Sequence, residues 1–175
     1  MKIPFCSFCI RSGILCSRCQ EKVQSGQVSK LDIRIAKLFL KLEEKYSSLQ
    51  KISFYNAYEV DGVLAIVVGR GDLHNFLSGS GRMMREIAES TGKKIRILEK
   101  GGDMRRFFED LFAPLMVTTI NTIWLPDGTT EIRVVLSGYR RRLPLKTNVL
   151  KELAKKIRGI TLRIAFEAQS KQNFR

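Results

Sequence analysis

Hydrophobic residues change their spacing along the chain, and each spacing predicts a type of element. From Leu31 to Leu49 they recur every three or four residues, which indicates a helix with one buried face. The loosely alternating residues 51–58 and the apolar run Val63–Val68 flank Asp61-Gly62, and two strand-like runs around Asp-Gly predict a β-hairpin. The first part of the folded chain is therefore expected to contain a helix followed by two paired strands.

After this hairpin, small residues separate two helical patterns. A short helical turn is expected over Asp72–Leu77, and a second helix is expected to begin at Arg82 and to end at Thr91-Gly92. Ser78-Gly79-Ser80-Gly81 stands between them, and the basic strand 93–97 closes the unit. A loop without side-chain bulk, placed between helix ends and followed by arginine, lets a polyanion backbone approach closely.

The same order of elements is predicted a second time. Asp61-Gly62 matches Asp127-Gly128, and Gly92 matches Gly159, at a nearly constant offset that indicates an internal duplication. An α+β fold with two similar units follows from this repetition. The second set consists of a helix over 103–112, strands over 115–124 and 131–136, a short helix over 139–143, a longer helix over 147–157 and a strand over 160–166.

Aromatic residues of the second set are expected to serve the fold. Phe107, Phe108 and Phe112 have helical spacing, which is more typical of core packing than of a surface for base stacking. Trp124 stands beside the turn at Pro126-Asp127-Gly128 and is expected to anchor the end of a hairpin.

All four cysteines lie within the first twenty residues, as two CxxC pairs formed by Cys6 and Cys9 and by Cys16 and Cys19. Two such pairs close together suit one tetrahedral Zn²⁺ with four thiolate ligands. Disulfides would need an oxidising compartment, which no feature of the sequence supports, and a thioredoxin-like setting for a redox CxxC is absent. One structural zinc ion without an open coordination position is therefore predicted, followed by a polar linker over 20–30.

The chain is strongly basic, with a formal net charge of +14 among 175 residues. Such a balance favours nucleic acid or another anionic surface as partner, although a generally basic surface is the alternative. No apolar run approaches the roughly 20 residues of a membrane helix, and the N-terminus lacks the apolar core of a signal peptide. A cytoplasmic protein without membrane contact is expected. Between Gly138 and Arg163 the basic residues outnumber the single acidic one, Glu152; they are Arg140, Arg141, Arg142, Lys146, Lys151, Lys155, Lys156, Arg158 and Arg163.

The repeated order helix–strand–strand–helix–helix–strand resembles tandem type II KH domains. Members of that family clamp single-stranded nucleic acid with a GxxG loop between two helices. Here the loop keeps only the second family glycine, Gly81, and Ser78 stands at the first position. The corresponding second loop, 144–148, has no glycine and offers charge instead, so the resemblance implies a degenerate second KH domain that contributes electrostatic contacts.

Paired type II KH domains that pack together resemble the KH portion of the transcription factor NusA, especially its short archaeal relatives. The segments 81–85 and 91–95 carry this resemblance, which covers roughly residues 30 to 169. It divides the chain into a zinc module with linker (1–29), a first KH domain (30–101), a second, degenerate KH domain (102–169) and a tail (170–175).

The resemblance implies an RNA-binding factor of transcription elongation or termination that acts without catalysis, with RNA polymerase as partner. An rRNA-binding ribosomal component or ribosome assembly factor is the alternative, because a zinc module and high basicity fit it equally well. No paired carboxylates with a His or Ser partner and no phosphate-binding Walker loop occur. The RNA-contacting residues implied for the first domain are Ser78, Gly79, Ser80, Gly81, Arg82 and Arg85, and those for the second are Arg140, Arg141, Arg142, Lys146 and Lys151.

Overall fold

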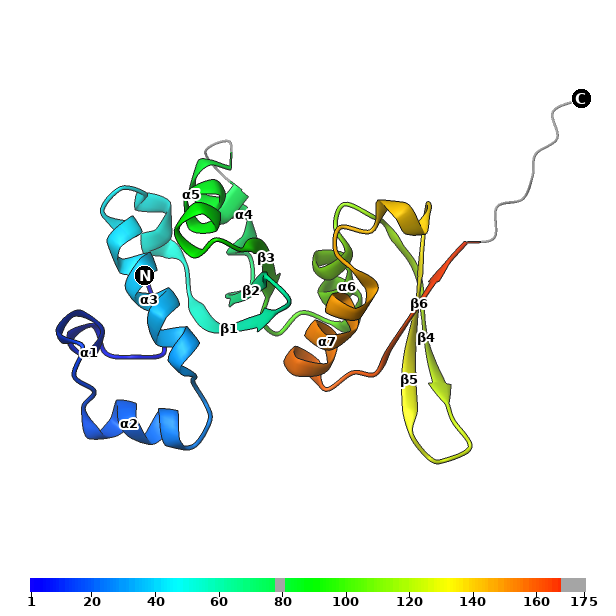
Figure 1. The fold of residues 1–175 in the computed structure, drawn as a ribbon, viewed down its shortest axis with the longest axis horizontal. Coiled ribbons are helices and arrows are strands. Elements are labelled where there is room, and N and C mark those ends of the chain that lie inside the picture. The colour runs from blue at the N-terminus through cyan, green and yellow to red at the C-terminus, as the bar shows by residue number, and fades with distance from the viewer. Residues whose placement is uncertain (78–80, 168–175) are drawn as a thin grey trace, which may run out of the picture. The chain divides into compact units, whose positions relative to one another are not determined.

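The computed structural model describes residues 1–77 and 81–167, which form helices and two three-stranded sheets. The predicted α+β class is confirmed. The chain divides into two compact units, Met1–Gly102 and Asp103–Arg175, and each has a sheet of its own (Figure 1). None of the helices in the described ranges is long and apolar enough to cross a membrane.

The first unit begins with two short helices and continues with the predicted order of elements. In its sheet β2 is central, pairing antiparallel with β1 and parallel with β3. The unit comprises α1 (Ser7–Ser12), α2 (Ser17–Gln24), α3 (Lys30–Glu43), the 3-10 helix η1 (Ser47–Lys51), β1 (Phe54–Val60), β2 (Val63–Val68), α4 (Leu73–Leu77), α5 (Arg82–Thr91) and β3 (Lys94–Glu99).

Burial of the apolar central strand organises the first unit. All six residues of β2 are buried, as expected for a strand with neighbours on both edges and a continuous apolar sequence. On the core side Phe39 of α3 lies edge-on to Phe54 of β1 and next to Phe76 of α4, with ring centroids 5.4 and 5.8 Å apart. The two helices α4 and α5 are thereby fixed on the same core as α3, because Met83 and Ile87 of α5 belong to it as well.

A buried carboxylate fixes the start of α3. Ser29 and Asp32 form a capping box, in which each side chain accepts a hydrogen bond from the other residue's backbone N–H. Asp32 is only 1% exposed and also accepts from the backbone N–H of Ala57 in β1. This carboxylate therefore joins the first helix to the first strand.

The helix that begins there is shorter than the predicted 31–49. It ends at Glu43, whose carboxylate pairs with the N-terminal amine of Met1 at 2.6 Å. The chain then turns through η1 and brings Leu49 and Ile52 fully into the core. Burial of these two side chains, which a straight helix could not place there, overrides the helical periodicity.

Replacing Asp32 with alanine should lower the free energy of unfolding by about 2–4 kcal/mol, because one cap is lost and a buried N–H is left without an acceptor. Asp103→Ala is the matched control, since the Asp103 carboxylate caps α6 by accepting from the Arg106 N–H at 2.7 Å on the surface, and it should cost only about 1 kcal/mol. Urea unfolding followed by circular dichroism measures both. Equal small losses would contradict the role assigned to Asp32.

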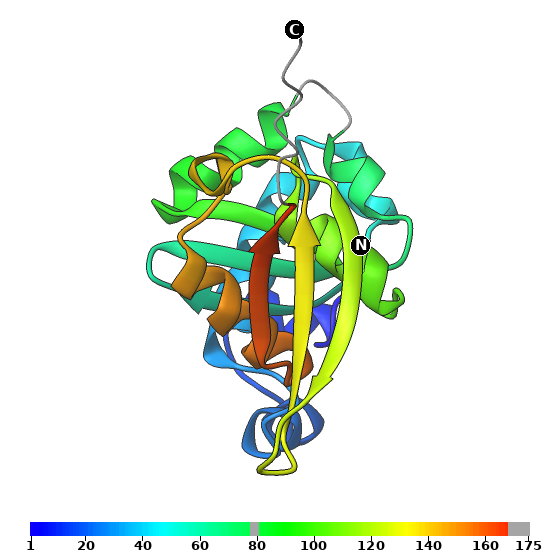
Figure 2. The same ribbon diagram turned by 90° about the vertical axis from the view of Figure 1, so that its right-hand side faces the viewer.

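The second unit repeats the sheet pattern of the first. Its middle strand pairs antiparallel with the preceding strand and parallel with the last one, and Figure 2 shows the face of this sheet that no helix within residues 103–167 covers. The unit comprises α6 (Met104–Phe112), β4 (Val117–Trp124), β5 (Thr130–Leu136), the 3-10 helix η2 (Arg140–Arg142), α7 (Thr147–Arg158) and β6 (Leu162–Phe166).

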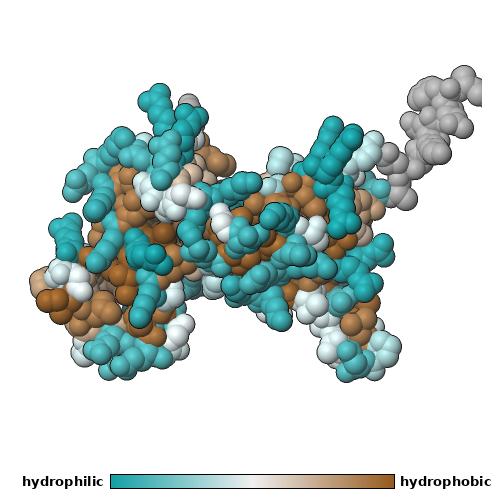
Figure 3. All heavy atoms as spheres, in the orientation of Figure 1, coloured by the Kyte–Doolittle hydropathy of each residue, from teal (hydrophilic) through white to brown (hydrophobic). Residues whose placement is uncertain are grey.

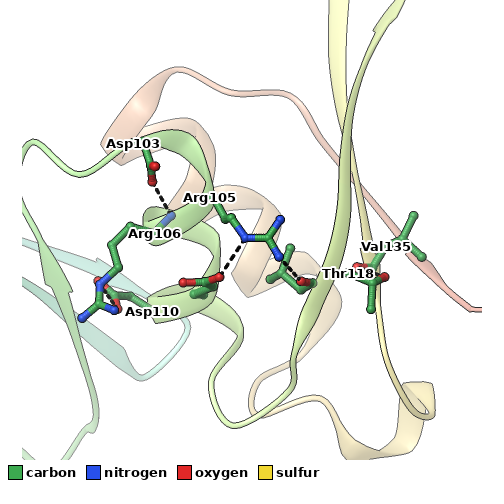
Figure 4. A network of polar contacts seen from close by, with 8 residues as sticks. Asp103, Arg105, Arg106, Asp110, Thr118 and Val135 are labelled. Carbon is green, nitrogen blue, oxygen red and sulfur yellow. Dashed lines mark hydrogen bonds and ion pairs between the residues drawn. The ribbon is translucent and has the colours of Figure 1, made fainter.

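A polar network attaches α6 to the sheet of this unit (Figure 4). Arg105 lies between the Glu109 carboxylate and the Val117 carbonyl oxygen, at 3.1 Å from each. In the irregular part of the β4–β5 ladder, the Thr118 hydroxyl donates to the Val135 carbonyl at 3.0 Å. The helix is therefore held at the edge where β4 begins.

The predicted aromatic core is confirmed, whereas the predicted anchor is wrong. Phe107, Phe108 and Phe112 are at most 1% exposed, but Trp124 is 77% exposed. The turn end of the β4–β5 hairpin extends past α6 and α7 (Figure 1), and Trp124 is the last residue of β4 at that end.

Candidate metal centre and candidate nucleic-acid interface

The four cysteine sulfur atoms converge, all lying within 4.8 Å of one another. Cys6 Sγ is 3.9 Å from Cys16 Sγ and 3.8 Å from Cys19 Sγ. Four thiolates around one tetrahedral zinc, with Zn–S near 2.3 Å, would be about 3.8 Å apart. Cys6 and Cys9 are closer, at 2.8 Å, yet far beyond the roughly 2.05 Å of a disulfide. This cluster can therefore hold a metal ion.

Helix starts position these thiols. Cys6 and Cys16 are the N-cap residues of α1 and α2, and Cys9 and Cys19 follow in the first turns. The backbone N–H groups at these starts favour thiolates. A hydrogen bond from the Cys19 backbone N–H, the largest contribution, lowers the pKa of Cys16 to about 7. The contact with Cys6 is the main reason that the pKa of Cys9 is raised to about 12, so a metal must displace a proton there.

The four-cysteine module is part of the first unit's core rather than an appendage. Phe5, Ile10 and Val28 are buried in the same cluster as Phe39 of α3, and Lys2 forms an isolated bridge with Ser53. Toward solvent the module is apolar over α1, as the space-filling view shows (Figure 3). Loss of the metal would therefore disturb the packing against α3.

The predicted nucleotide clamp lies between α4 and α5. Ser78, Gly79 and Ser80 are outside the described residues. Gly81 is the N-cap of α5, with φ +71° and no side-chain cap on the helix. Among the described residues, no atom lies within 4 Å of a Cβ added at Gly81. The start of α5 therefore presents backbone without side-chain bulk, at the positive end of a helix.

Two acidic side chains hold the chain that leads into α4. The Asp72 carboxylate accepts from the Ser53 N–H at 2.7 Å, and the buried Glu99 accepts from the N–H groups of Gly71 and Leu73 at 3.0 and 3.2 Å. A side chain at Gly69 would have to displace this Asp72 carboxylate, because a Cβ there would lie 2.5 Å from Asp72 Oδ2. The segment that leads into α4 is thus held against β3 and the start of β1.

Arg82 and Arg85 line one depression of about 340 Å³ at the start of α5. Both side chains are exposed. Sequence reasoning had not associated Lys45 and Tyr46 with them, although both line the same depression. These two donate to Glu86 at 2.7 Å each, and the hydrogen bond from Lys45 is the main reason that the pKa of Glu86 is lowered. Glu86 is therefore already paired with Lys45 and Tyr46, and the two arginines share the depression with one further carboxylate, that of Glu89.

In the second unit the predicted basic residues lie on the surface around the start of α7. Arg140–Arg142 form the exposed η2, and Figure 3 shows hydrophilic side chains projecting above it. The ring of Tyr139 lies under the guanidinium groups of Arg141 and Arg142, at 5.3 and 5.9 Å. This aromatic partner, which is 44% exposed, had no distinguishing signal in the sequence beyond its place before the arginines.

The α7 start differs from that of α5. Its N-cap is Lys146, with φ −59° and an exposed side chain, and Lys151 is exposed further along the helix. No residue with positive φ lies at this helix start. The second unit therefore offers cations where the first offers open backbone.

No protein-family model matches this chain, and no curated protein matches it. A solved structure described as "Crystal structure of APE1850" has 18% sequence identity to it, covers 73% of this chain and 96% of its own, and has a TM-score of 0.49.

Proposed function

We propose that the chain is an RNA-binding protein built from two type II KH domains and a four-cysteine zinc module. The order helix–strand–strand–helix–helix–strand in both units supports this proposal, as does the shared sheet pattern of an antiparallel hairpin followed by a parallel strand. The net charge of +14 provides the general attraction to a polyanion.

The observation that carries the proposal is the open, left-handed Gly81 at the start of α5. A phosphate placed there accepts hydrogen bonds from backbone N–H groups at the helix start and gains from the helix dipole. Arg82 and Arg85, on the exposed side of the same helix, supply charge to neighbouring phosphates. The chain holds the strand by its backbone, and no bond is made or broken, so the protein acts without catalysis.

The metal has a structural role in this proposal. Four cysteine thiolates whose sulfur atoms lie within 4.8 Å of one another suit one Zn²⁺ with a closed coordination sphere. Such an ion would hold α1 and α2 together on the side of α3. It would leave no position for a substrate.

Among RNA-binding roles we propose a transcription elongation or termination factor in the manner of NusA. One clamp followed by a second, cationic unit of the same order suits nascent single-stranded RNA, which needs no melting before it is bound. Affinity purification of the tagged full chain from its own cells tests this role. RNA polymerase subunits in the eluate support it, whereas ribosomal subunits without polymerase would assign the chain to the ribosome instead.

Replacing Arg82 with glutamine should weaken binding of a fluorescein-labelled oligouridine of about 12 nucleotides and lower the slope of log K against log [salt] by about 0.7, the value of one lost phosphate contact on a single strand. Fluorescence anisotropy across a salt series measures both quantities. Arg163→Gln is the control, because that exposed arginine is paired with Glu131 at 2.8 Å in the other unit. An unchanged slope for Arg82→Gln would remove Arg82 from the interface.

A further inference from the structure

The first unit has a second concave surface, away from the α4–α5 loop. This surface, the α3 groove, has a volume of about 340 Å³ and is lined by one side of α3, by the end of α5 and by residues of β1 and β2. Ser90 and Thr91 line it from α5. The ten residues of α5 place this end about 15 Å from the helix start at Gly81, so the groove is separate from the proposed clamp.

Three exposed cations form one rim of the groove. Arg34, Lys37 and Lys41 line it and recur at helical spacing, so they share one face of α3 over about 10 Å. The Lys37 amine also reaches the end of α1, because a Cβ at Gly13 would lie 3.7 Å from its Nζ. Opposite them Glu59 and Lys93 form an ion pair. The rim therefore has an excess of positive charge.

The floor of the groove is aliphatic. Leu31 and Leu38 are half-buried and pack on the core, while Ile35 and Leu64 are buried beneath them. In the described part of the chain no aromatic side chain lines the groove. It thus combines a row of cations with an apolar strip, running along two turns of one helix.

We propose that the α3 groove docks an acidic amphipathic helix of a partner protein. Leucine-like side chains spaced three and four residues apart would cover the floor, and carboxylates along one flank of the same helix would face Arg34, Lys37 and Lys41. RNA fits less well, because bases find no ring to stack on and phosphates would face Glu59 and the negative C-terminal end of α5. The proposal does not depend on the RNA clamp, since the two sites share no residue.

The test uses the full chain with two labelled probes. The first is a fluorescein-labelled peptide of about 16 residues, long enough to form a helix, built from leucine, alanine and glutamate with leucines three and four residues apart. The second is the oligouridine described above. Lys37→Glu/Lys41→Glu is compared with Lys2→Glu/Lys51→Glu, which makes the same change in net charge at exposed lysines outside the groove. A peptide with lysine in place of glutamate controls for apolar binding alone.

We expect Lys37→Glu/Lys41→Glu to weaken peptide binding at least about tenfold, because the peptide loses direct ion pairs with these two lysines. RNA binding should weaken by no more than it does in Lys2→Glu/Lys51→Glu. In the wild-type chain, methyl NMR signals of Leu31, Ile35 and Leu38 should shift on adding the peptide. The proposal fails if the wild-type chain does not bind the acidic peptide, or if binding is equal for both variants. It fails equally if RNA rather than peptide binding collapses in the groove variant, which would make the groove an RNA surface.

Discussion

Replacing Gly81 with aspartate should weaken binding of single-stranded RNA at least about tenfold, which corresponds to 1.4 kcal/mol or more. The carboxylate would lie at the start of α5, where the open backbone is expected to receive a phosphate. In the described part of the chain nothing lies within 4 Å of the new Cβ, and aspartate adopts a left-handed conformation more readily than most residues. The free energy of unfolding should therefore fall by no more than about 1–2 kcal/mol, the cost of a left-handed residue. Anisotropy with oligouridine and urea unfolding measure the two quantities.

Two controls separate charge from shape at this position. Gly81→Asn has nearly the same shape without the charge, and it should keep most of the affinity. Gly92→Asp places the same carboxylate at the other end of α5, where φ is +66° and the surroundings are equally open. That variant should bind RNA almost as well as the wild-type chain. Equal affinity of Gly81→Asp and Gly92→Asp would remove the α5 start from the RNA interface.

Removal of the metal should unfold the four-cysteine module and destabilise the first unit. Helices of six and eight residues do not persist alone in water, and metal binding to such a module supplies about 10–16 kcal/mol of apparent free energy. Amides of residues 7–24 should lose hydrogen-exchange protection by at least about a hundredfold after chelation. Elemental analysis before chelation should give one zinc per chain. Amides of α7 are the internal control, because they lie in the other unit and should keep their protection.

The same centre should bind its metal more weakly as the pH falls. The ligands are thiolates, and the pKa of Cys9 is raised to about 12 without metal, so metal uptake near neutral pH must release protons. Apparent affinity should therefore rise with pH between about pH 6 and 8, and uptake in a weakly buffered solution should acidify it. Uptake without proton release, or persistent amide protection after complete chelation, would show that the cysteines are not the ligands on which the module depends.

Local sequence signals predicted most elements of the fold. The apolar run 63–68 became the central strand β2, and the glycine at 92 ends α5 in a left-handed conformation. Asp-Gly pairs marked both hairpins. The failures came where packing acted against a local pattern. Leu49 and Ile52 turn into the core and so shorten the first helix of the repeat, while Trp124 is exposed at the turn end of a hairpin that extends past α6 and α7 (Figure 1).

The sequence by itself determined the α+β class, the repetition of one order of elements, and the pairing of cysteines that brings four sulfur atoms together, because each depends on residues that are neighbours along the chain. Only the tertiary structure decided that Lys45 and Tyr46 join Arg82 and Arg85, and that residues of α3, the first hairpin and the end of α5 form one groove. Hydrophobic periodicity indicates which face of a helix or strand is buried. It does not indicate which other helix or strand lies beside that face. In this protein α3 and α5 lie side by side because both pack on the common core around Phe39.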